Sequence, residues 1–196
     1  MTAPLDQPLR PPAPAVELLG DPARVAAVRR VLAQGTAASG LDRLTRLAAE
    51  LLGAPRCQVS LLAEEQVIAS VFGLDLPPDQ RTGPLAESLC TVTVTLGAPF
   101  AVTDARLDER VRDLPPVTSG AVRAYLGVPL VTGTGLVLGA LCVHDDEPRS
   151  WSPHDVGVLA ELGTSAIGAA FAPGGVNVSC PPLSPTVMTA PASSFR

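Results

Sequence analysis

Apolar residues recur every three or four positions in three segments of the chain, which is the pattern of helices that bury one face. The first predicted helix covers residues 21–34 and opens with Asp21 and Pro22, the order of an N-cap followed by a first-turn proline. The second begins after Gly40 and ends at Gly53. The pattern therefore predicts two amphipathic helices in the N-terminal part of the chain.

The third helix has the clearest start signal. Ser152 stands at the N-cap position, Pro153 follows at the first helical position, and Asp155 comes three residues after the cap. Its predicted apolar face consists of Val156, Leu159, Leu162, Ala166, Ile167 and Ala170. The helix is expected to end at Pro173, which begins a Pro-Gly-Gly sequence.

Runs of β-branched and other apolar residues predict two hairpins and one further strand. The first hairpin joins residues 57–62 to residues 67–73. The second covers residues 122–145, with a turn of Thr and Gly at 132–135. Because its strands hold few reactive side chains, this hairpin suits a pocket wall or the middle of a sheet. Residues 100–104 form the further short strand.

Three connecting segments complete the pattern. Residues 74–84 have little periodicity and are expected to run over the surface, where they could cover a binding site. Residues 85–96 fit a helix or a strand, and their length with the stop at Gly97 favours a helix. A short helix is predicted at 107–114. Helices segregated from five or six strands predict an α+β fold with an antiparallel sheet.

Composition divides the chain into a compact part and two tails. Hydrophobic residues make up 46% of the 196 positions, enough for a real core. Many of the 21 prolines fall near the two ends, outside any apolar periodicity. Residues 1–16 and 172–196 are therefore predicted to be tails without a fixed fold, and residues 17–171 to be the domain.

Charge excludes several classes of function. The net charge is −5, and all 14 basic residues are arginines spread along the chain, so nucleic acids and anionic membranes are not expected partners. The absence of lysine excludes Schiff-base chemistry and a Walker A phosphate loop. Without a membrane-length apolar run or a signal pattern, the protein is expected to be cytoplasmic.

Seven short blocks resemble one known family. They occur at residues 41–49, 59–62, 87–90, 102–105, 108–111, 125–130 and 138–143. In content and order they are similar to GAF domains, in particular to the bacterial GAF domains found with histidine kinases and diguanylate cyclases. The resemblance covers about residues 24–171.

The resemblance implies a central antiparallel sheet of five to six strands, with helices packed on its back and a ligand pocket on its front. It also implies dimers built by the first and last helices. We therefore expect a stand-alone, non-enzymatic sensory domain that binds a small molecule and regulates a separate signalling partner, such as a histidine kinase, as a homodimer. The resemblance leaves the ligand or cofactor open, because GAF ligands range from cyclic nucleotides to haem, bilins and metabolites.

Five residues are the candidates for ligand binding. Cys90 belongs to the helix expected to overlook the pocket, where a thiol can bind a chromophore or sense oxidants; the alternative is a small buried residue, since no Lys or His lies nearby in the sequence. Asp104, Asp113, Arg123 and Tyr125 are placed around the pocket mouth. Arg123 would bind an anionic group and Tyr125 would stack. The alternative is a surface ion pair and a sheet aromatic.

Two other functions stay open. Free methionine-(R)-sulfoxide reductases are GAF proteins that use pocket cysteines, but their catalytic cysteine would be expected at residues 121–124, where this chain has Ala-Val-Arg-Ala. The other alternative is a ligandless dimerisation module whose pocket is filled by its own side chains. No metal site is expected, because Cys142 and His144 share a strand face without a second pair of ligands.

Overall fold

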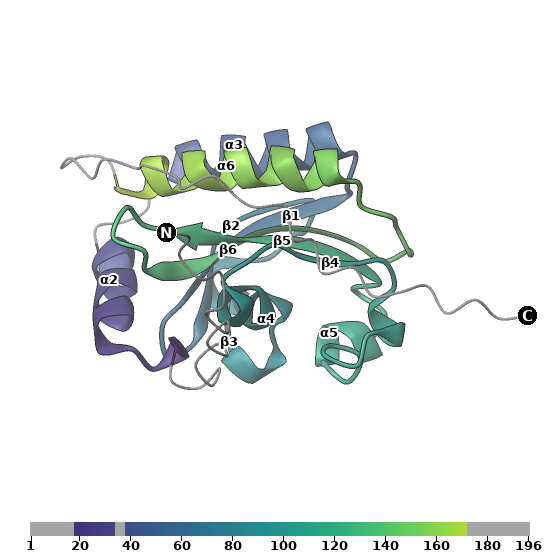
Figure 1. Cartoon of the computed structure of the whole chain (residues 1–196), viewed down its shortest axis with the longest axis horizontal. Coiled ribbons are helices and arrows are strands. Elements are labelled where there is room, and N and C mark those ends of the chain that lie inside the picture. The colour runs from purple at the N-terminus through teal and green to yellow at the C-terminus, as the bar shows by residue number, and fades with distance from the viewer. Residues whose placement is uncertain (1–17, 34–37, 172–196) are drawn as a thin grey trace, which may run out of the picture.

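A six-stranded antiparallel sheet forms the centre of the protein, in a computed structural model that describes residues 18–33 and 38–171. The strand order is β3-β2-β1-β6-β5-β4. The strands are β1 (Arg56–Leu62), β2 (Gln66–Phe72), β3 (Thr82–Gly83), β4 (Phe100–Val102), β5 (Ala124–Val131) and β6 (Val137–Asp145). Helices lie on both faces (Figure 1). The predicted α+β class and both predicted hairpins are confirmed, whereas the two predicted tails lie outside the described residues.

Two long helices, α3 (Ala38–Leu52) and α6 (Pro153–Phe171), lie side by side over the back of the sheet (Figure 1). The cap of α6 is the predicted one: the Ser152 backbone N–H donates to the Asp155 carboxylate at 2.8 Å, and the Asp155 N–H donates to the Ser152 hydroxyl at 3.2 Å. The apolar faces of both helices meet the sheet in one hydrophobic core, which includes Leu41, Leu44, Ala48, Leu126, Val128, Leu141, Leu159 and Ile167.

The front of the sheet carries shorter elements. These are α4 (Leu89–Leu96), α5 (Pro115–Thr118) and the 3-10 turns η2 (Leu85–Glu87) and η3 (Ala105–Leu107), while a further 3-10 turn, η1 (Pro78–Gln80), lies in the connection from β2 to β3. A second core beneath them includes Cys90, Phe100, Tyr125 and Cys142. Because side chains alternate along a strand, β6 places Leu141 in the back core and its neighbour Cys142 in the front core.

The helix α2 (Pro22–Ala33) stands beside the sheet (Figure 1). Asp21 caps it as predicted, since its carboxylate accepts the backbone N–H of Ala23 at 2.7 Å. The sequence pattern did not indicate that the guanidinium of Arg24 is buried. It donates to the backbone carbonyls of Leu18, Leu19 and Leu62, and thereby ties the start of α2 to the end of β1.

Two connecting segments differ from the prediction. The helix expected at 85–96 begins only at residue 89, because the Ser88 hydroxyl caps α4 by accepting the Cys90 backbone N–H, and η2 precedes the cap. The prediction of a helix at 107–114 is wrong, because these residues form turns. There the Asp108 side chain accepts the Arg110 backbone N–H and pairs with its guanidinium, which lies 4.5 Å from the Phe100 ring centre. Side-chain hydrogen bonding to the backbone thus replaces helix formation.

Among the described residues, no helix combines the length and apolarity needed to span a membrane.

Candidate functional site

Two thiols meet at the centre of the front core. Cys90 comes from the first turn of α4 and Cys142 from the middle of β6, and their sulfur atoms are 3.6 Å apart. Both side chains are buried, and both are free thiols rather than halves of a disulfide. Cys90 was a candidate from the sequence, whereas Cys142 was considered there only as a metal ligand and was not expected to be one. Their proximity depends on the packing of α4 against β6, which no local pattern records.

Neutral hydrogen-bond donors surround the Cys90 sulfur. The Tyr125 hydroxyl donates to it from 3.6 Å and the Gln58 side-chain amide from 3.7 Å. The Ser60 oxygen lies 3.5 Å from the sulfur and accepts from the amides of both Gln58 and Gln66, at 3.0 Å and 2.9 Å. The Cys90 thiol donates to this oxygen, and once the thiol ionises the Ser60 hydroxyl can turn its own hydrogen toward the sulfur.

These donors change the acidity of the two thiols. The pKa of Cys90 falls to about 6, chiefly because the Cys142 thiol hydrogen-bonds to it, and this outweighs the opposing effect of burial. The pKa of Cys142 is raised well above its usual value, by that same hydrogen bond and by burial. The pair therefore loses its first proton easily and keeps its second. The lowered pKa of Cys90 could not be predicted from its neighbours in the sequence, since the residues that cause it come from three strands.

Tyr125 covers the middle of the front face. Its hydroxyl lies 2.8 Å from the Thr93 hydroxyl on α4, and its ring centre is 5.7 Å from that of Phe100. A side chain at Gly127 would place its Cβ 2.3 Å from the Tyr125 hydroxyl oxygen. The ring therefore lies along its own strand, in space that glycine leaves open.

The structure brings the predicted polar residues together only in part. Arg123 pairs with Asp104 through two hydrogen bonds, one of them 3.0 Å from Nε to Oδ1, and this pairing holds the pKa of Asp104 below its usual value. Asp113 lies apart from them: its side chain is 90% exposed, and its carboxylate is 3.7 Å from Arg112. Cys90 and Tyr125 form a second, separate pair in the core.

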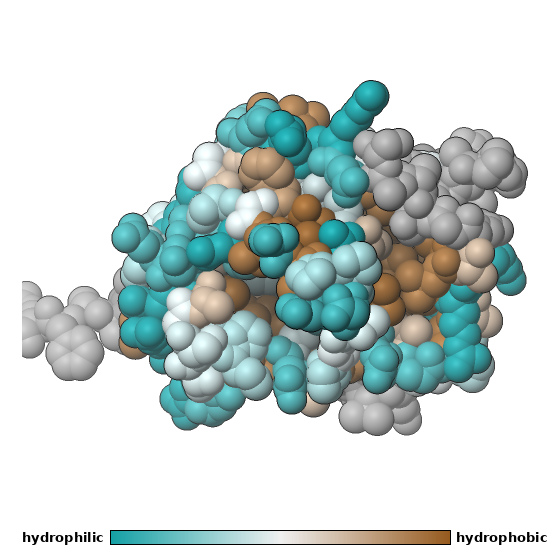
Figure 2. Space-filling model, turned by 180° about the vertical axis from the view of Figure 1, so that it is seen from behind, coloured by the Kyte–Doolittle hydropathy of each residue, from teal (hydrophilic) through white to brown (hydrophobic). Residues whose placement is uncertain are grey.

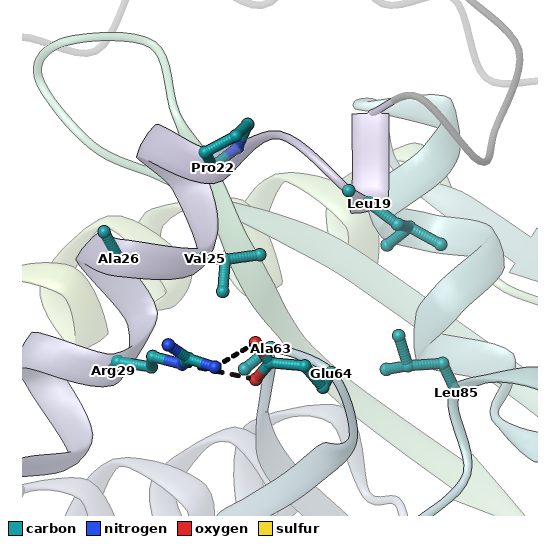
Figure 3. A pocket seen from close by; sticks show the side chains of 9 residues that line it. Leu19, Pro22, Val25, Ala26, Arg29, Ala63, Glu64 and Leu85 are labelled. Atoms are coloured by element: carbon teal, nitrogen blue, oxygen red, sulfur yellow. Dashed lines mark hydrogen bonds and ion pairs between the residues drawn. The ribbon is translucent and has the colours of Figure 1, made fainter.

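An open groove of about 600 Å³ lies between α2, the turn after β1 and η2 (Figure 3). It is lined by Leu19, Gly20, Pro22, Val25, Ala26, Arg29, Ala63, Glu64 and Leu85. Arg29 and Glu64 form an exposed ion pair at 2.5 Å, so the otherwise apolar groove has one charged wall. Sequence reasoning did not find it, because ordinary residues from three distant segments make it up.

The groove and the thiol pair share a supporting element. The Leu85 carbonyl accepts the Thr91 hydroxyl of α4 at 2.6 Å, and Leu85 lines the groove. Cys90 is the residue before Thr91. A movement of α4 that alters the groove will therefore alter the surroundings of Cys90 as well.

His144 is a second buried titratable group on β6. Within the described part of the chain its Nδ1 atom has no hydrogen-bond partner, and burial lowers its pKa to about 4. Although it follows Cys142 on the same strand face, no cluster of three or more His, Cys, Asp or Glu side chains suited to a metal ion occurs among residues 18–33 and 38–171.

Comparison with known proteins gives one family match and one relative in sequence. The GAF domain family matches residues 38–169. A cyclic di-GMP phosphodiesterase of Pseudomonas aeruginosa is 39% identical over 108 residues, which are 54% of this chain and 18% of that protein. The chain thus spans less than a fifth of the length of this relative.

Solved structures show the same fold. The GAF domain of an Acinetobacter phosphoenolpyruvate-protein phosphotransferase superposes with a TM-score of 0.58 at 20% identity, covering 76% of this chain and 93% of that domain. The free methionine-R-sulfoxide reductase of Neisseria meningitidis gives a TM-score of 0.56 at 20% identity, covering 87% and 98% of the two chains. At this identity the likeness concerns the fold alone.

Proposed function

Because the chain belongs to the GAF domain family, in which small-molecule binding in signalling is typical, we propose that it is a cytoplasmic sensory domain. Its groove binds a small molecule, and its back helices pass the occupancy to a separate signalling protein. One observation carries this proposal: the hydrogen bond between Thr91 and Leu85 joins the groove wall to α4, which packs on the sheet.

The groove suits a particular class of ligand. Its lining is mostly apolar, while Arg29 and Glu64 supply one charge of each sign at the wall (Figure 3). A small molecule with an apolar body and one polar or charged group matches this combination. Its volume of about 600 Å³ is within the usual size of ligand sites.

The five residues predicted from the sequence remain proposed ligand-binding residues for a molecule that enters the front layer more deeply. Such a molecule must displace the Tyr125 ring, which now fills the space beside Cys90. An anionic group that reaches Arg123 must compete with Asp104 for its guanidinium. Asp113, which is exposed, would contribute only at the rim.

The back helices are the proposed output. Leu47 and Leu51 on α3 are 45% and 59% exposed, although they belong to the apolar pattern of that helix. Apolar patches are visible between hydrophilic ones where α3 and α6 form the top of the molecule (Figure 2). We propose that this surface pairs two copies of the domain and contacts the signalling partner, such as a histidine kinase. The named role of the Pseudomonas relative supports a signalling context.

Comparing native with denaturing mass spectra of the purified protein, followed by a thermal-shift screen of metabolites and nucleotides, tests ligand binding. We expect a non-covalent ligand, or a compound that raises the melting temperature. The shift should disappear in Val25→Glu, which puts a charge in the groove wall, and persist in Arg30→Glu on the exposed side of the same helix. A bare polypeptide that no compound stabilises would favour the ligandless dimerisation module.

A thiol enzyme is the second candidate, favoured by the Cys90–Cys142 pair at 3.6 Å. In that case free methionine-(R)-sulfoxide would be reduced with a thioredoxin system, and Cys90→Ser would abolish the reaction. The absence of turnover by the native protein would remove this candidate.

A further inference from the structure

The Cys90 and Cys142 sulfurs are close enough to bond after a small movement. They are 3.6 Å apart, whereas the two sulfurs of a disulfide are about 2.05 Å apart. Cys142 lies on β6, which is held between β1 and β5, while Cys90 lies on the short surface helix α4. Rotation of the two side chains, with a small shift of α4 toward the sheet, closes the difference.

We propose that this pair is a redox site at which hydroperoxides convert the two thiols into a reversible disulfide. The Cys90 thiolate attacks a peroxide oxygen, the O–O bond breaks, and the leaving hydroxide or alkoxide takes up a proton as water or an alcohol. The Cys142 sulfur then attacks the sulfenic sulfur of Cys90 and forms the S–S bond. The S–O bond breaks and its oxygen leaves as water with the Cys142 proton. Two electrons pass from the thiols to the peroxide.

The surroundings of the pair assign the two roles. Hydrogen bonds from Tyr125 and Gln58 converge on Cys90 and stabilise its thiolate, which is the form that reacts with peroxides. The Ser60 hydroxyl, which lies 3.5 Å from the same sulfur, also lowers its pKa. Cys142 keeps its proton beside that thiolate, as the direction of its pKa shift indicates. Cys90 is therefore the residue that is oxidised first, and Cys142 is the residue that resolves it. A dithiol reductant restores both thiols by exchange.

Access to the buried sulfur depends on α4. Five of its eight residues are Thr or Val, whose branched side chains favour a helix only weakly. The helix is therefore maintained by packing and by its caps at Ser88 and Gly97 rather than by intrinsic propensity. Local opening of such a short element costs less free energy than global unfolding and admits a molecule as small as hydrogen peroxide.

Cys57 provides an internal comparison. It is also a buried free thiol, but it belongs to the back core, on the other face of β1 from Ser60. Burial raises its pKa, so it offers little thiolate at neutral pH. The proposal therefore predicts that peroxide oxidises Cys90 faster than Cys57 in the same folded chain.

Disulfide formation also has a structural consequence. Thr93 and Thr91, which follow Cys90 on α4, bond to Tyr125 and to the Leu85 carbonyl. A shift of α4 toward β6 changes both contacts and hence the wall of the groove. This coupling does not depend on whether the groove holds a ligand.

The experiment uses the full chain with Cys57→Ala and Cys180→Ser, so that Cys90 and Cys142 are the remaining thiols. The folded protein is treated with hydrogen peroxide, quenched, and digested with trypsin without reduction. We expect an intact mass lower by two hydrogen atoms and a cross-link between the tryptic peptides 82–106 and 124–149. Dithiothreitol should restore the original mass.

Further variants separate the steps. With Cys142→Ala added, dimedone should trap a sulfenic acid on Cys90, whereas with Cys90→Ala added Cys142 should stay reduced. In the otherwise native chain, Cys90 should be oxidised at least tenfold faster than Cys57. The proposal is overturned if the folded protein keeps both thiols in excess peroxide, if Cys90 passes to sulfinic acid while Cys142 is present, or if Cys57 reacts as fast. Circular dichroism confirms that each variant is folded.

Discussion

The hydroxyl oxygen of Tyr125 lies 2.3 Å from the position that a Cβ atom would take at Gly127, two residues further along the same strand. The tyrosine ring is therefore laid along the sheet, beneath α4, by the absence of a side chain. In this place it donates to Cys90 and contacts Thr93. The glycine thus determines how the front core is filled and which hydroxyl group donates to the Cys90 sulfur.

Gly127→Ala should lower the free energy of unfolding by about 1–3 kcal/mol, because the new methyl group displaces a fully buried ring. Urea unfolding measures this change. Gly157→Ala is the matched control. Gly157 lies on the exposed side of α6, and no atom of residues 18–33 and 38–171 is within 4 Å of its Cβ position. The substitution should stabilise the helix by up to about 1 kcal/mol. Equal effects of the two substitutions would contradict the packing role of Gly127.

The alkylation rate of Cys90 by iodoacetamide should rise with pH and level off, with its midpoint near pH 6. The midpoint stays near pH 6 whether iodoacetamide reacts with the closed protein or only after α4 has opened. If opening is required, ionisation of Cys90 in the folded state stabilises the closed form above pH 6, and this offsets the growing fraction of thiolate in the open form. Tyr125→Phe removes one donor and should move the midpoint upward. A midpoint near 8.5, the ordinary value for cysteine, would show that the donors do not stabilise the thiolate.

Acid should destabilise the protein through His144. Its pKa in the folded state, about 4, lies below its value of about 6.5 in the unfolded chain. Above pH 6.5 the histidine is neutral in both the folded and the unfolded state, so the stability that depends on its neutral form is fully present. As the pH falls from 6.5 to 4 the unfolded state takes up a proton first, and up to roughly 3 kcal/mol is lost.

Urea unfolding at pH 7 and pH 4.5 measures the effect of His144. His144→Leu cannot titrate and should lose less stability between the two pH values than the native protein. His154→Gln, at an exposed position of α6, is the control and should follow the native protein. If the leucine variant shows the same loss as the native protein, other groups cause the acid sensitivity.

Arg24 should be important for stability despite its charge. Arg24→Met leaves the carbonyls of Leu18, Leu19 and Leu62 without their donor, and we expect a loss of at least about 2 kcal/mol in the free energy of unfolding. Arg30→Met, on the exposed side of the same helix, should change it by less than about 0.5 kcal/mol. A similar small effect of both substitutions would mean that water replaces the lost donor.

Periodicity and capping signals were enough to predict most of the secondary structure. The Asp21 and Ser152 caps and both hairpins depend on residues that are close together in the sequence, so the local pattern contains the relevant physics. The pattern failed at 107–114, where Asp108 binds Arg110 and the backbone instead of continuing a helix. Such side-chain competition depends on the nearby Phe100 ring, which the local sequence does not reveal.

The site was less predictable than the fold. Cys90 and Tyr125 were named from the sequence, but the residues that change the acidity of Cys90 lie on the strands β1, β5 and β6, far from α4 in the sequence. Gln58 and Ser60 carried a weak signal, as polar residues alternating with apolar ones on a buried strand. The burial of Arg24 carried no signal, since its carbonyl partners could not be known before the start of α2 was placed beside the end of β1.

The pairing of β1 with β6 has a consequence for how the protein is made. Arg56 at one end of β1 pairs with His144, so the centre of the sheet joins segments that are 88 residues apart in the sequence (144 − 56). On the ribosome, the β1–β2 hairpin emerges long before β6, which is the other neighbour of β1. Until β6 is synthesised, one row of backbone N–H and C=O groups on β1 has no partner strand. Such an edge can recruit strands from other chains. Translation speed and chaperones should therefore affect the yield of this domain more than its final stability would suggest.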